Sequence, residues 1–335
     1  MPITLAQAQV NTQSDVDYSV IDNLRRYSWL LDQIVFDDTV TPGTAGGSLT
    51  YGYTRLVTAA PASFRALNTE YTPGQATRQR FSVDLKPMGG SFSVDRVLKN
   101  LGAAATNEVT FQMQQLETSI RTRFAQELIL GDTAVDANGF DGLSKLLVGS
   151  STEKTATVSD WTASTVITQP LAMARLDEVD EWLSSIVPSH TGGGDQGTPG
   201  ALPPGTKAIL GNTKSITRFK ALARWAAIYT EEKDSLGRKI MSYGDWVLVD
   251  LGDRADGASS IIPTTAGGVT DLYAVTFGLD SVHAASAAGN PLVQTWLPDF
   301  STAGAVKTGE IEMGPAALVV KNTKAAGVLR SIDVV

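Results

Sequence analysis

The sequence predicts an α+β fold, on the strength of three observations. A long amphipathic helix is predicted over residues 106–130, β-rich segments precede it between residues 49 and 97, and the second half alternates helical and strand patterns. The chain has 335 residues, which is enough for two packed domains, and its 42% hydrophobic and 19% charged residues are typical of globular proteins. We therefore expect a globular chain that is stabilised by packing.

Composition excludes several classes of function. The sequence contains no cysteine, which excludes disulfides and thiolate metal sites and fits a protein made in the cytoplasm. The N-terminus has no basic region followed by an apolar core, and no stretch approaches the roughly 18 apolar residues of a spanning helix, so no membrane partner is expected. The net charge of −8 argues against tight sequence-independent DNA binding, because phosphate contacts require clustered Lys and Arg.

The first element expected is a helix that begins at Asp17 or Ser19 and runs to Asp38. Its apolar residues recur at helical spacing, and the glycine-rich sequence from Pro42 onwards ends it. Residues 1–16 are mostly polar and show no core pattern. We expect them to form an extended arm that another surface must hold.

A long two-stranded excursion is expected next. Two β-rich runs, 49–57 and 80–85, show partial alternation, and prolines and a glycine interrupt the stretch between them. An isolated ribbon is only marginally stable in water. The apolar residues Phe64, Leu67 and Tyr71 should therefore find a neighbouring surface.

The same excursion is basic in an otherwise acidic protein. It carries four arginines, Arg55, Arg65, Arg78 and Arg80, against the single acidic residue Glu70, which is a local charge of +3 (4 − 1). One interpretation is a solvated hairpin. The other is an arm that lies on an acidic patch of the next subunit.

The helix over residues 106–130 is the longest predicted element. Its apolar stripe consists of Val109, Met113, Leu116, Ile120, Phe124 and Leu128. Thr106 or Asn107 can cap its start, and Gly131 stands where a left-handed glycine ends many helices. The opposite face is polar, so an ordinary surface helix is the alternative interpretation.

The second half alternates helices and strands. Helices are expected over residues 172–186 and 213–225, where apolar residues repeat at helical spacing. The apolar face of the first consists of Leu171, Met173, Leu176, Val179, Leu183 and Ile186. Strands are expected at residues 207–212, 245–250, 272–277, 310–313 and 317–320, with a turn and a further strand around 234–240. The glycine- and proline-rich residues 191–205 are interpreted as a mobile loop.

Two glycine patterns in that loop match nucleotide-binding motifs by letters alone. Gly192-x-Gly194-x-x-Gly197 has the dinucleotide spacing, but a helix precedes it and prolines follow, whereas the motif needs a strand before and a helix after. The stretch from Gly200 to Lys207 ends in Gly-Thr-Lys rather than Gly-Lys-Thr, and two prolines remove an amide that a phosphate cradle needs. Neither pattern predicts a cofactor site.

Other candidate sites have equally little support. Asp177 and Glu181 lie one helical turn apart, where two carboxylates can bind a cation or act as acid and base, but no further ligand-type residue accompanies them. His283 follows Asp280 and Ser281, yet three triad members so close in sequence do not generally converge on one point. We therefore expect no catalytic, cofactor or metal site.

The order of motifs along the chain carries a family resemblance. The long helix ends at Gly131-Asp132 and is followed by Phe140-Asp141-Gly142-Leu143. Later motifs are Ala208-Ile-Leu-Gly-Asn-Thr-Lys214, Asp234-Ser-Leu-Gly-Arg238, Tyr243-Gly244-Asp245 and Tyr273-Ala-Val-Thr-Phe-Gly278. This succession resembles the major capsid proteins of tailed bacteriophages, which have the Hong Kong 97 fold. Each motif is weak alone, and their order extends the likeness over nearly the whole chain.

The resemblance implies a Hong Kong 97-like α+β capsid fold in four parts. These are an N-terminal arm at 1–48, an extended β-hairpin loop at 49–97, a peripheral domain built on the spine helix at 98–165 and 270–312, and an axial domain at 166–269 and 313–335. Residues 191–205 are then a candidate axial loop around the symmetry axis of the capsomer.

The function that the resemblance implies is assembly rather than catalysis. Copies of the chain would form pentamers and hexamers that close an icosahedral shell around weakly contacted double-stranded DNA, in a virion assembled in the cytoplasm of a bacterial host. The inter-subunit contacts expected from the extended loop are Arg55, Phe64, Arg65, Leu67, Tyr71, Arg78 and Arg80. Further partners would be a portal, a separate scaffold protein and decoration proteins.

Two departures from the family pattern refine this expectation. Some members link subunits covalently through a lysine on the extended loop, but residues 50–85 contain no lysine and Lys86 lies at the base, so a noncovalent shell is expected. Others carry a long N-terminal scaffolding segment. Only about 48 residues precede the β excursion here, which favours a separate scaffold protein.

Two rival functions remain. An encapsulin-type nanocompartment has the same fold and encloses a cargo enzyme; the longer N-terminal arm and the long β excursion favour the phage shell over it. A nucleotide- or sugar-dependent α/β enzyme would need a convergent polar pocket, which no motif in the sequence supports.

Overall fold

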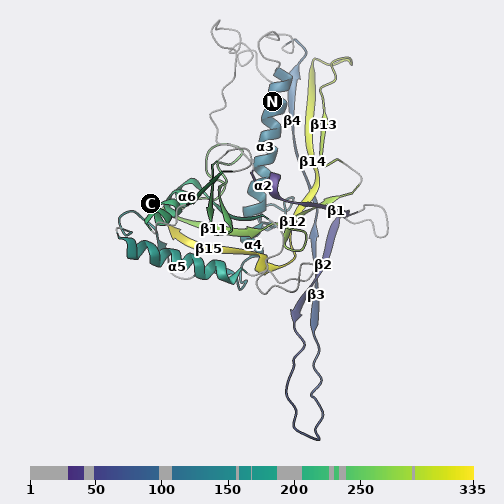
Figure 1. Cartoon of the computed structure of the whole chain (residues 1–335). Helices are drawn as coiled ribbons and strands as arrows, with labels where there is room; N and C mark the ends of the chain where they lie inside the picture. The colour runs from purple at the N-terminus through teal and green to yellow at the C-terminus, as the bar shows by residue number, and fades with distance from the viewer. Residues whose placement is uncertain are drawn as a thin grey trace.

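Two sheets, one projecting hairpin and a long helix organise the chain (Figure 1). The computed structural model describes residues 29–40, 49–97, 108–155, 158–166, 168–186, 206–225, 230–233, 239–288 and 291–335. Predictions for the arm at 1–16, the start of the first helix, the caps Thr106 and Asn107, the loop 191–205 and the turn at 234–238 lie outside these residues. None of the helices in the described part is long and apolar enough to cross a membrane.

A five-stranded sheet lies beside the long helix. Its strands are β1 (Phe36–Val40), β12 (Val282–Ala287), β14 (Val306–Val320) and β13 (Val293–Trp296) in spatial order, with β4 (Lys86–Asp95) also paired to β14. The 15-residue strand β14 has two halves. Its first half pairs with β4 and β13, and its second half, from Ala316 to Val320, continues alongside β12. The strand thus joins the elongated part of the subunit to its centre.

The predicted segments 310–313 and 317–320 are one continuous strand. Gly314 and Pro315 link them at the point where the register between β14 and β4 shifts. Proline lacks an amide hydrogen and is tolerated in sheets at such irregularities. The sequence pattern could not show that the second half gains a new partner, β12, beyond that shift.

The predicted long helix is present as α3 (Glu108–Leu130) and is about 34 Å long at 1.5 Å per residue. The C-terminal half of the predicted stripe, Ile120, Phe124 and Leu128, is buried in the core. The N-terminal half is only partly buried and packs along β4. Leu116 comes so close there that a Cβ on Gly90 would lie 2.5 Å from its Cδ1, and a larger residue at position 90 would make the leucine side chain shift.

The turn after α3 is buried, and its geometry corrects the predicted role of Gly131. Its φ is not positive; its amide donates a regular helical hydrogen bond to the Glu127 carbonyl at 2.9 Å. Glycine is needed because a Cβ there would lie 2.2 Å from the carbonyl oxygen of Phe140. Gly142 donates to the Gly131 carbonyl at 2.9 Å, so two backbone segments meet without side chains between them.

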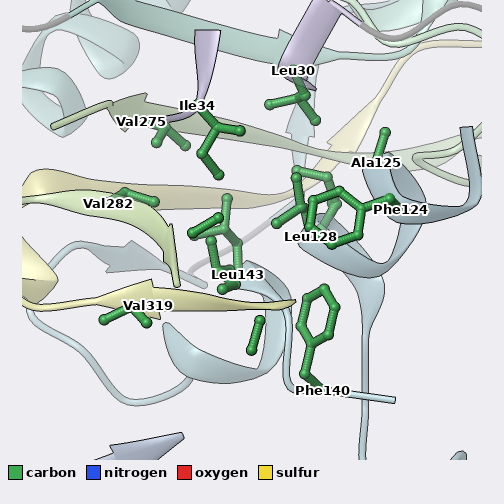
Figure 2. Packing of buried hydrophobic residues seen from close by; sticks show 14 of the residues in the cluster. Leu30, Ile34, Phe124, Ala125, Leu128, Phe140, Leu143, Val275, Val282 and Val319 are labelled. Atoms are coloured by element: carbon green, nitrogen blue, oxygen red, sulfur yellow. The ribbon is translucent and has the colours of Figure 1, made fainter. Parts of the chain in front are cut away.

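Phe140 and Leu143, which opens the short helix α4 (Leu143–Leu146), fill the space below α3 (Figure 2). The Phe140 ring lies 5.6 Å from the ring of Phe124. Around them, Leu128 and residues of the sheet such as Val319 complete one hydrophobic core. The alternative of an ordinary surface helix is therefore wrong for the second half of α3.

The first predicted helix is wrong at its C-terminal end. The helix α2 (Trp29–Gln33) ends early, and the chain continues as β1, parallel to β12. Ile34 closes the helix with a hydrogen bond to the Leu30 carbonyl, and both side chains are buried against the end of α3 (Figure 2). The apolar spacing up to Val35 fits a helix, but the open edge of β12 gives the next residues ladder hydrogen bonds.

An eight-stranded sheet forms the second layer. Its order is β5 (Glu153–Lys154), β15 (Ala326–Asp333), β11 (Val269–Thr276), β7 (Lys207–Gly211), β10 (Trp246–Asp250), β9 (Lys239–Tyr243) and β8 (Thr230–Lys233), with β6 (Ser159–Asp160) also paired to β15. The short 3-10 turn η2 (Thr323–Ala325) precedes β15. The strands predicted near 207, 245 and 272 are confirmed, whereas β15 and β12 were not predicted.

The helices α5 (Gln169–Ser185) and α6 (Thr213–Trp225) cover this sheet and confirm the two helices predicted there. The buried face of α5 differs from the prediction. Leu176 and Val179 are buried as expected, but Met173 is half exposed and Trp182, which was not assigned to the face, is fully inside. The Trp182 indole donates to the Thr152 carbonyl at 3.2 Å, which lets a large polar-tipped ring enter the core.

Candidate assembly interface

The predicted excursion is an antiparallel hairpin of β2 (Thr50–Thr58) and β3 (Thr77–Asp84). The register runs from Thr50 opposite Asp84 to Thr58 opposite Thr77, and the chain between them, residues 59–76, continues outward. Figure 1 shows the hairpin projecting away from both sheets. Its own two strands make the only ladder it has among the described residues, so most of its surface faces solvent.

The far end of the hairpin carries unprotected apolar side chains. Phe64 is fully exposed, Leu67 is 90% exposed and Tyr71 is largely exposed. Burying each such side chain contributes roughly 1.5–3 kcal/mol, and the isolated subunit gains none of it from Phe64 or Leu67. Adjacent exposed apolar residues of this kind mark surfaces that contact another molecule.

The end of the hairpin nevertheless has local order. Arg65 donates to the Thr69 carbonyl at 3.2 Å and lies 5.4 Å from the centre of the Tyr71 ring. Asn68, with a φ of 62°, makes the turn between them. The segment therefore presents Phe64 and Leu67 from a shaped turn, which reduces the entropy lost when they bind.

The predicted arginines divide into two groups. Arg65, Arg78 and Arg80 are exposed and can reach a partner. Arg55 is half buried and bonded within its own chain: its Nε donates to the Lys321 carbonyl at 2.9 Å, and its NH2 group donates to the carbonyl of Val320. Arg55 therefore has a role at the base of the hairpin within its own chain, and its expected contact with the next subunit stays a prediction.

The base of the hairpin holds a group of polar side chains that the sequence prediction missed. We define the root cluster as Asp37 of β1, Tyr51 and Arg55 of β2, His283 of β12, and Lys321, which follows β14. Tyr51 donates to Asp37 Oδ2 at 2.9 Å, and its ring meets the His283 imidazole edge-on at 5.6 Å. The Lys321 ammonium lies 5.7 Å from the centre of the Tyr51 ring.

Aromatic rings also contact the Arg55 guanidinium. Its guanidinium lies 4.4 Å from the centre of the Phe81 ring and 5.2 Å from that of Tyr53, and it donates to the Tyr53 hydroxyl at 3.0 Å. Tyr51, Tyr53 and Arg55 alternate in β2 and so share one face of the strand. This alternation of Tyr51, Tyr53 and Arg55 was the one signal in the sequence that could have predicted the binding of the Arg55 side chain at the base of the hairpin.

Burial sets the protonation states in the root cluster. Burial alone would raise the pKa of Asp37, but hydrogen bonds from Tyr51 and Thr39 and the nearby His283 hold it below its usual value. Burial and the Asp37 carboxylate raise the pKa of Tyr51. Burial, with the cation of Lys321 nearby, lowers the pKa of His283 to about 4, so the imidazole is neutral at pH 7.

The other candidate residues form no reactive site. Both ring nitrogens of His283 lack a hydrogen-bond partner, so Ser281 is not its triad partner. Glu181 pairs with Lys154 at 2.8 Å instead of forming a cation site with Asp177. No group of three metal-ligating side chains occurs among the described residues.

A hollow of about 480 Å³ lies between the start of α6 and the C-terminal residues. It is wide open and is lined mostly by apolar atoms of Thr213, Lys214, Thr217, Arg218, Val334 and Val335. An enzyme of the nucleotide- or sugar-dependent kind needs several convergent polar groups in an enclosed pocket. This hollow gives that rival no support.

Solved structures with the same arrangement include chains of an encapsulin complex and of bacteriophages. A chain of the holo-SrpI encapsulin complex from Synechococcus elongatus PCC 7942 matches with a TM-score of 0.62 and 12% identity, over 100% of this chain and 97% of that one. The capsid of Myoviridae phage XM1 matches with a TM-score of 0.58 and 14% identity over 98% of both chains. A chain of Mycobacterium phage Bobi matches with a TM-score of 0.57 and 12% identity over 99% of both chains.

These matches define the class of fold. Phage capsids and an encapsulin superpose over nearly the full length of the chain, so the protein has the Hong Kong 97 fold of shell proteins. No family model matches the sequence, and no curated protein is significantly similar to it. At 10–14% identity the matches establish the fold, and the function has to be argued from the surfaces of the subunit.

Proposed function

We propose that this chain is the major capsid protein of a tailed bacteriophage and self-assembles into pentamers and hexamers that form an icosahedral shell around double-stranded DNA. The observation that carries the proposal is the projecting hairpin with Phe64 and Leu67 exposed at its far end, on a chain with a shell-protein fold. A subunit that projects apolar residues this far is incomplete alone. Neighbouring copies in a closed shell would cover them and leave no open hairpin.

The charge of the hairpin supports a second copy of the chain as the partner. The exposed Arg65, Arg78 and Arg80 belong to a chain with a net charge of −8, so another subunit offers the opposite charge. Many moderate interfaces of this kind sum to a stable shell while each contact stays reversible during assembly. A portal, a separate scaffold protein and decoration proteins would complete the particle.

The division into parts stays a proposal that strand pairing refines. The arm is assigned to residues 1–48, the extended loop to 49–97, the peripheral domain to 98–165 and 270–312, and the axial domain to 166–269 and 313–335. The pairing of β4 with β14 supports placing β4 in the peripheral domain, and the pairing of β11 with β7 supports placing β11 with the axial sheet.

Assembly is tested with the full-length chain and one matched pair of variants. Sizing and negative-stain microscopy are expected to show capsomer rings or shells, alone or with the scaffold protein. Leu67→Asp is expected to fold, because the Leu67 side chain contacts little in the subunit. It is expected to remain a monomer, because a carboxylate replaces the apolar side chain that a neighbouring subunit would cover. Val135→Asp is the control, since Val135 is also exposed but lies after α3. A wild-type chain that stays monomeric at all concentrations with scaffold present contradicts the proposal.

The rival function is an encapsulin-type nanocompartment that encloses a cargo enzyme. The match to the encapsulin chain is at least as good as those to the phage chains, so overall fold does not separate the two. The length of the hairpin favours the phage shell. Particles purified from the native source are expected to contain DNA; a protein cargo without DNA would establish the nanocompartment instead.

A further inference from the structure

The root cluster contains a buried imidazole without a hydrogen bond. His283 is 0% exposed, and neither Nδ1 nor Nε2 has a partner. Its Nε2 lies 3.9 Å from Asp37 Oδ2, just beyond hydrogen-bond distance. A buried polar group left unpaired costs free energy, so a role beyond packing is worth seeking at this position.

We propose that His283 is an acid-sensitive switch at the base of the hairpin: when neutral, it lets Tyr51 hold the hairpin against the five-stranded sheet, and when protonated, it breaks that hold. The inference concerns the single subunit and does not depend on the proposed shell. It rests on what surrounds the imidazole and on how Tyr51 is anchored.

The charged and titratable groups around His283 come from four segments. Asp37 lies on β1, Tyr51 on β2, Lys321 just after β14, and Asp280 in the turn before β12. The two carboxylates favour the imidazolium, whereas burial and the Lys321 ammonium oppose it more strongly. The neutral imidazole is therefore the form that the packed structure accepts.

Protonation gives the buried imidazole a charge and two N–H donors that have no acceptor in the packed structure. An imidazolium has two N–H donors, and the nearest carboxylate oxygen, Asp37 Oδ2, already accepts from the Tyr51 hydroxyl at 2.9 Å. Asp37 can accept both donors, but the imidazolium has to move closer than 3.9 Å to bond to it. The Tyr51 ring, which packs edge-on against the imidazole at 5.6 Å, has to move with it, so the Tyr51 hydroxyl loses its place on Asp37. Asp37 stays ionised in this range, because its own pKa is held below the usual value.

Loss of the Tyr51 anchor loosens the hairpin, which Arg55 still links to the carbonyls of Val320 and Lys321. Tyr51 is buried at the base, while the strand is exposed from Leu56 outward. A small rotation at the base is amplified at Phe64 and Leu67 because the hairpin is long and bears on no other described element at its far end (Figure 1). The switch therefore changes the direction in which the apolar end is presented.

The sign of the pH dependence follows from the direction of the pKa shift. The pKa of His283 is about 4 when packed and about 6.5 when released into water. The packed state is fully favoured above about pH 6.5, and this preference is lost progressively as the pH falls toward 4. The hairpin is thus expected to be fixed at neutral pH and mobile in acid.

Distance measurement between two spin labels tests the switch. The chain has no native cysteine, so Thr72→Cys on the hairpin and Val135→Cys after α3 provide the only two labels. Labelled chains diluted with unlabelled chains report distances within one subunit, whether or not shells form. A single narrow distance distribution at pH 7.5 is expected to broaden with a midpoint between pH 4 and 6.5, and His283→Gln is expected to keep the narrow distribution throughout.

If His283→Gln fails to fold, variants of the charged residues around His283 test the proposal instead. Asp280→Asn removes an exposed carboxylate that favours the imidazolium, so the midpoint should move to lower pH; Lys321→Gln should move it to higher pH. The imidazole proton resonances follow protonation directly, since the chain has only two histidines. An unchanged distribution while His283 protonates, an undiminished response in His283→Gln, or midpoints that neither charge variant moves would overturn the proposal.

Discussion

The junction after α3 and the hairpin β2–β3 both carry a phenylalanine, but it is buried in the junction and exposed on the hairpin. At the junction, Phe140 is 3% exposed and packs on Phe124, and the backbones of Gly131 and Gly142 meet directly. On the hairpin, Phe64 has no covering neighbour among the described residues. The first region stabilises the subunit by itself. The second can gain its burial energy only from another molecule, so folding and the proposed assembly depend on different regions of one chain.

Replacing phenylalanine by alanine in each region tests this difference most directly and has the largest expected effect. Phe140→Ala leaves a cavity in the core and is expected to lower the free energy of unfolding by about 3–5 kcal/mol. Phe64→Ala removes an exposed ring and should change it by less than about 0.5 kcal/mol. Urea unfolding of both variants under conditions that keep the subunit monomeric measures the difference.

Assembly should respond in the opposite order. Phe64→Ala is expected to raise the concentration needed for assembly about tenfold or more, because roughly 1.5–3 kcal/mol of burial is lost at each interface. Light scattering against protein concentration measures this threshold. Equal loss of stability in the two variants, or normal assembly of Phe64→Ala, would mean that the hairpin and the junction do not divide these tasks.

A smaller effect on stability is expected at the base of the hairpin, where the hairpin is attached to the rest of the subunit. Arg55→Ala removes hydrogen bonds to two backbone carbonyls and a cation stacked on Phe81, and should destabilise the hairpin's attachment by about 2 kcal/mol. Arg55→Lys keeps the charge but not the planar fork, so it should recover only part of the loss. Hydrogen exchange of the β2 amides is the measurement; full recovery by lysine would exclude the bonded geometry as the cause.

The smallest effect is expected on the exposed face of α3. Arg121 pairs with Glu117 at 2.6 Å, but both side chains are at least half exposed. Such a pair contributes roughly 0.5 kcal/mol or less, so Arg121→Ala should leave the melting temperature nearly unchanged and be indifferent to salt. A loss of more than 1 kcal/mol would show that this face of α3 belongs to the stabilising region after all.

The sequence predicted the elements whose pattern is local. The periodicity of α3 from Ile120 to Leu128, the helix Thr213–Trp225 and the two strands of the hairpin follow from side-chain spacing and turn residues, and all are present. The order of weak motifs also predicted the Hong Kong 97 fold, which the solved structures confirm. The residues expected at inter-subunit contacts stay a prediction, including Arg55, which also forms hydrogen bonds within its own chain.

Features that depend on residues distant in sequence could be found only from the tertiary structure. The sequence alone determined that the chain is built of helices and sheets with a projecting, basic, apolar-tipped hairpin, because these properties reside in neighbouring residues. Only the fold decided that residues after Ile34 form a strand, since the open edge of β12 supplies the hydrogen bonds. Likewise, only the fold brought Asp37 beside His283, because long-range packing and the burial it brings set both contact and protonation state.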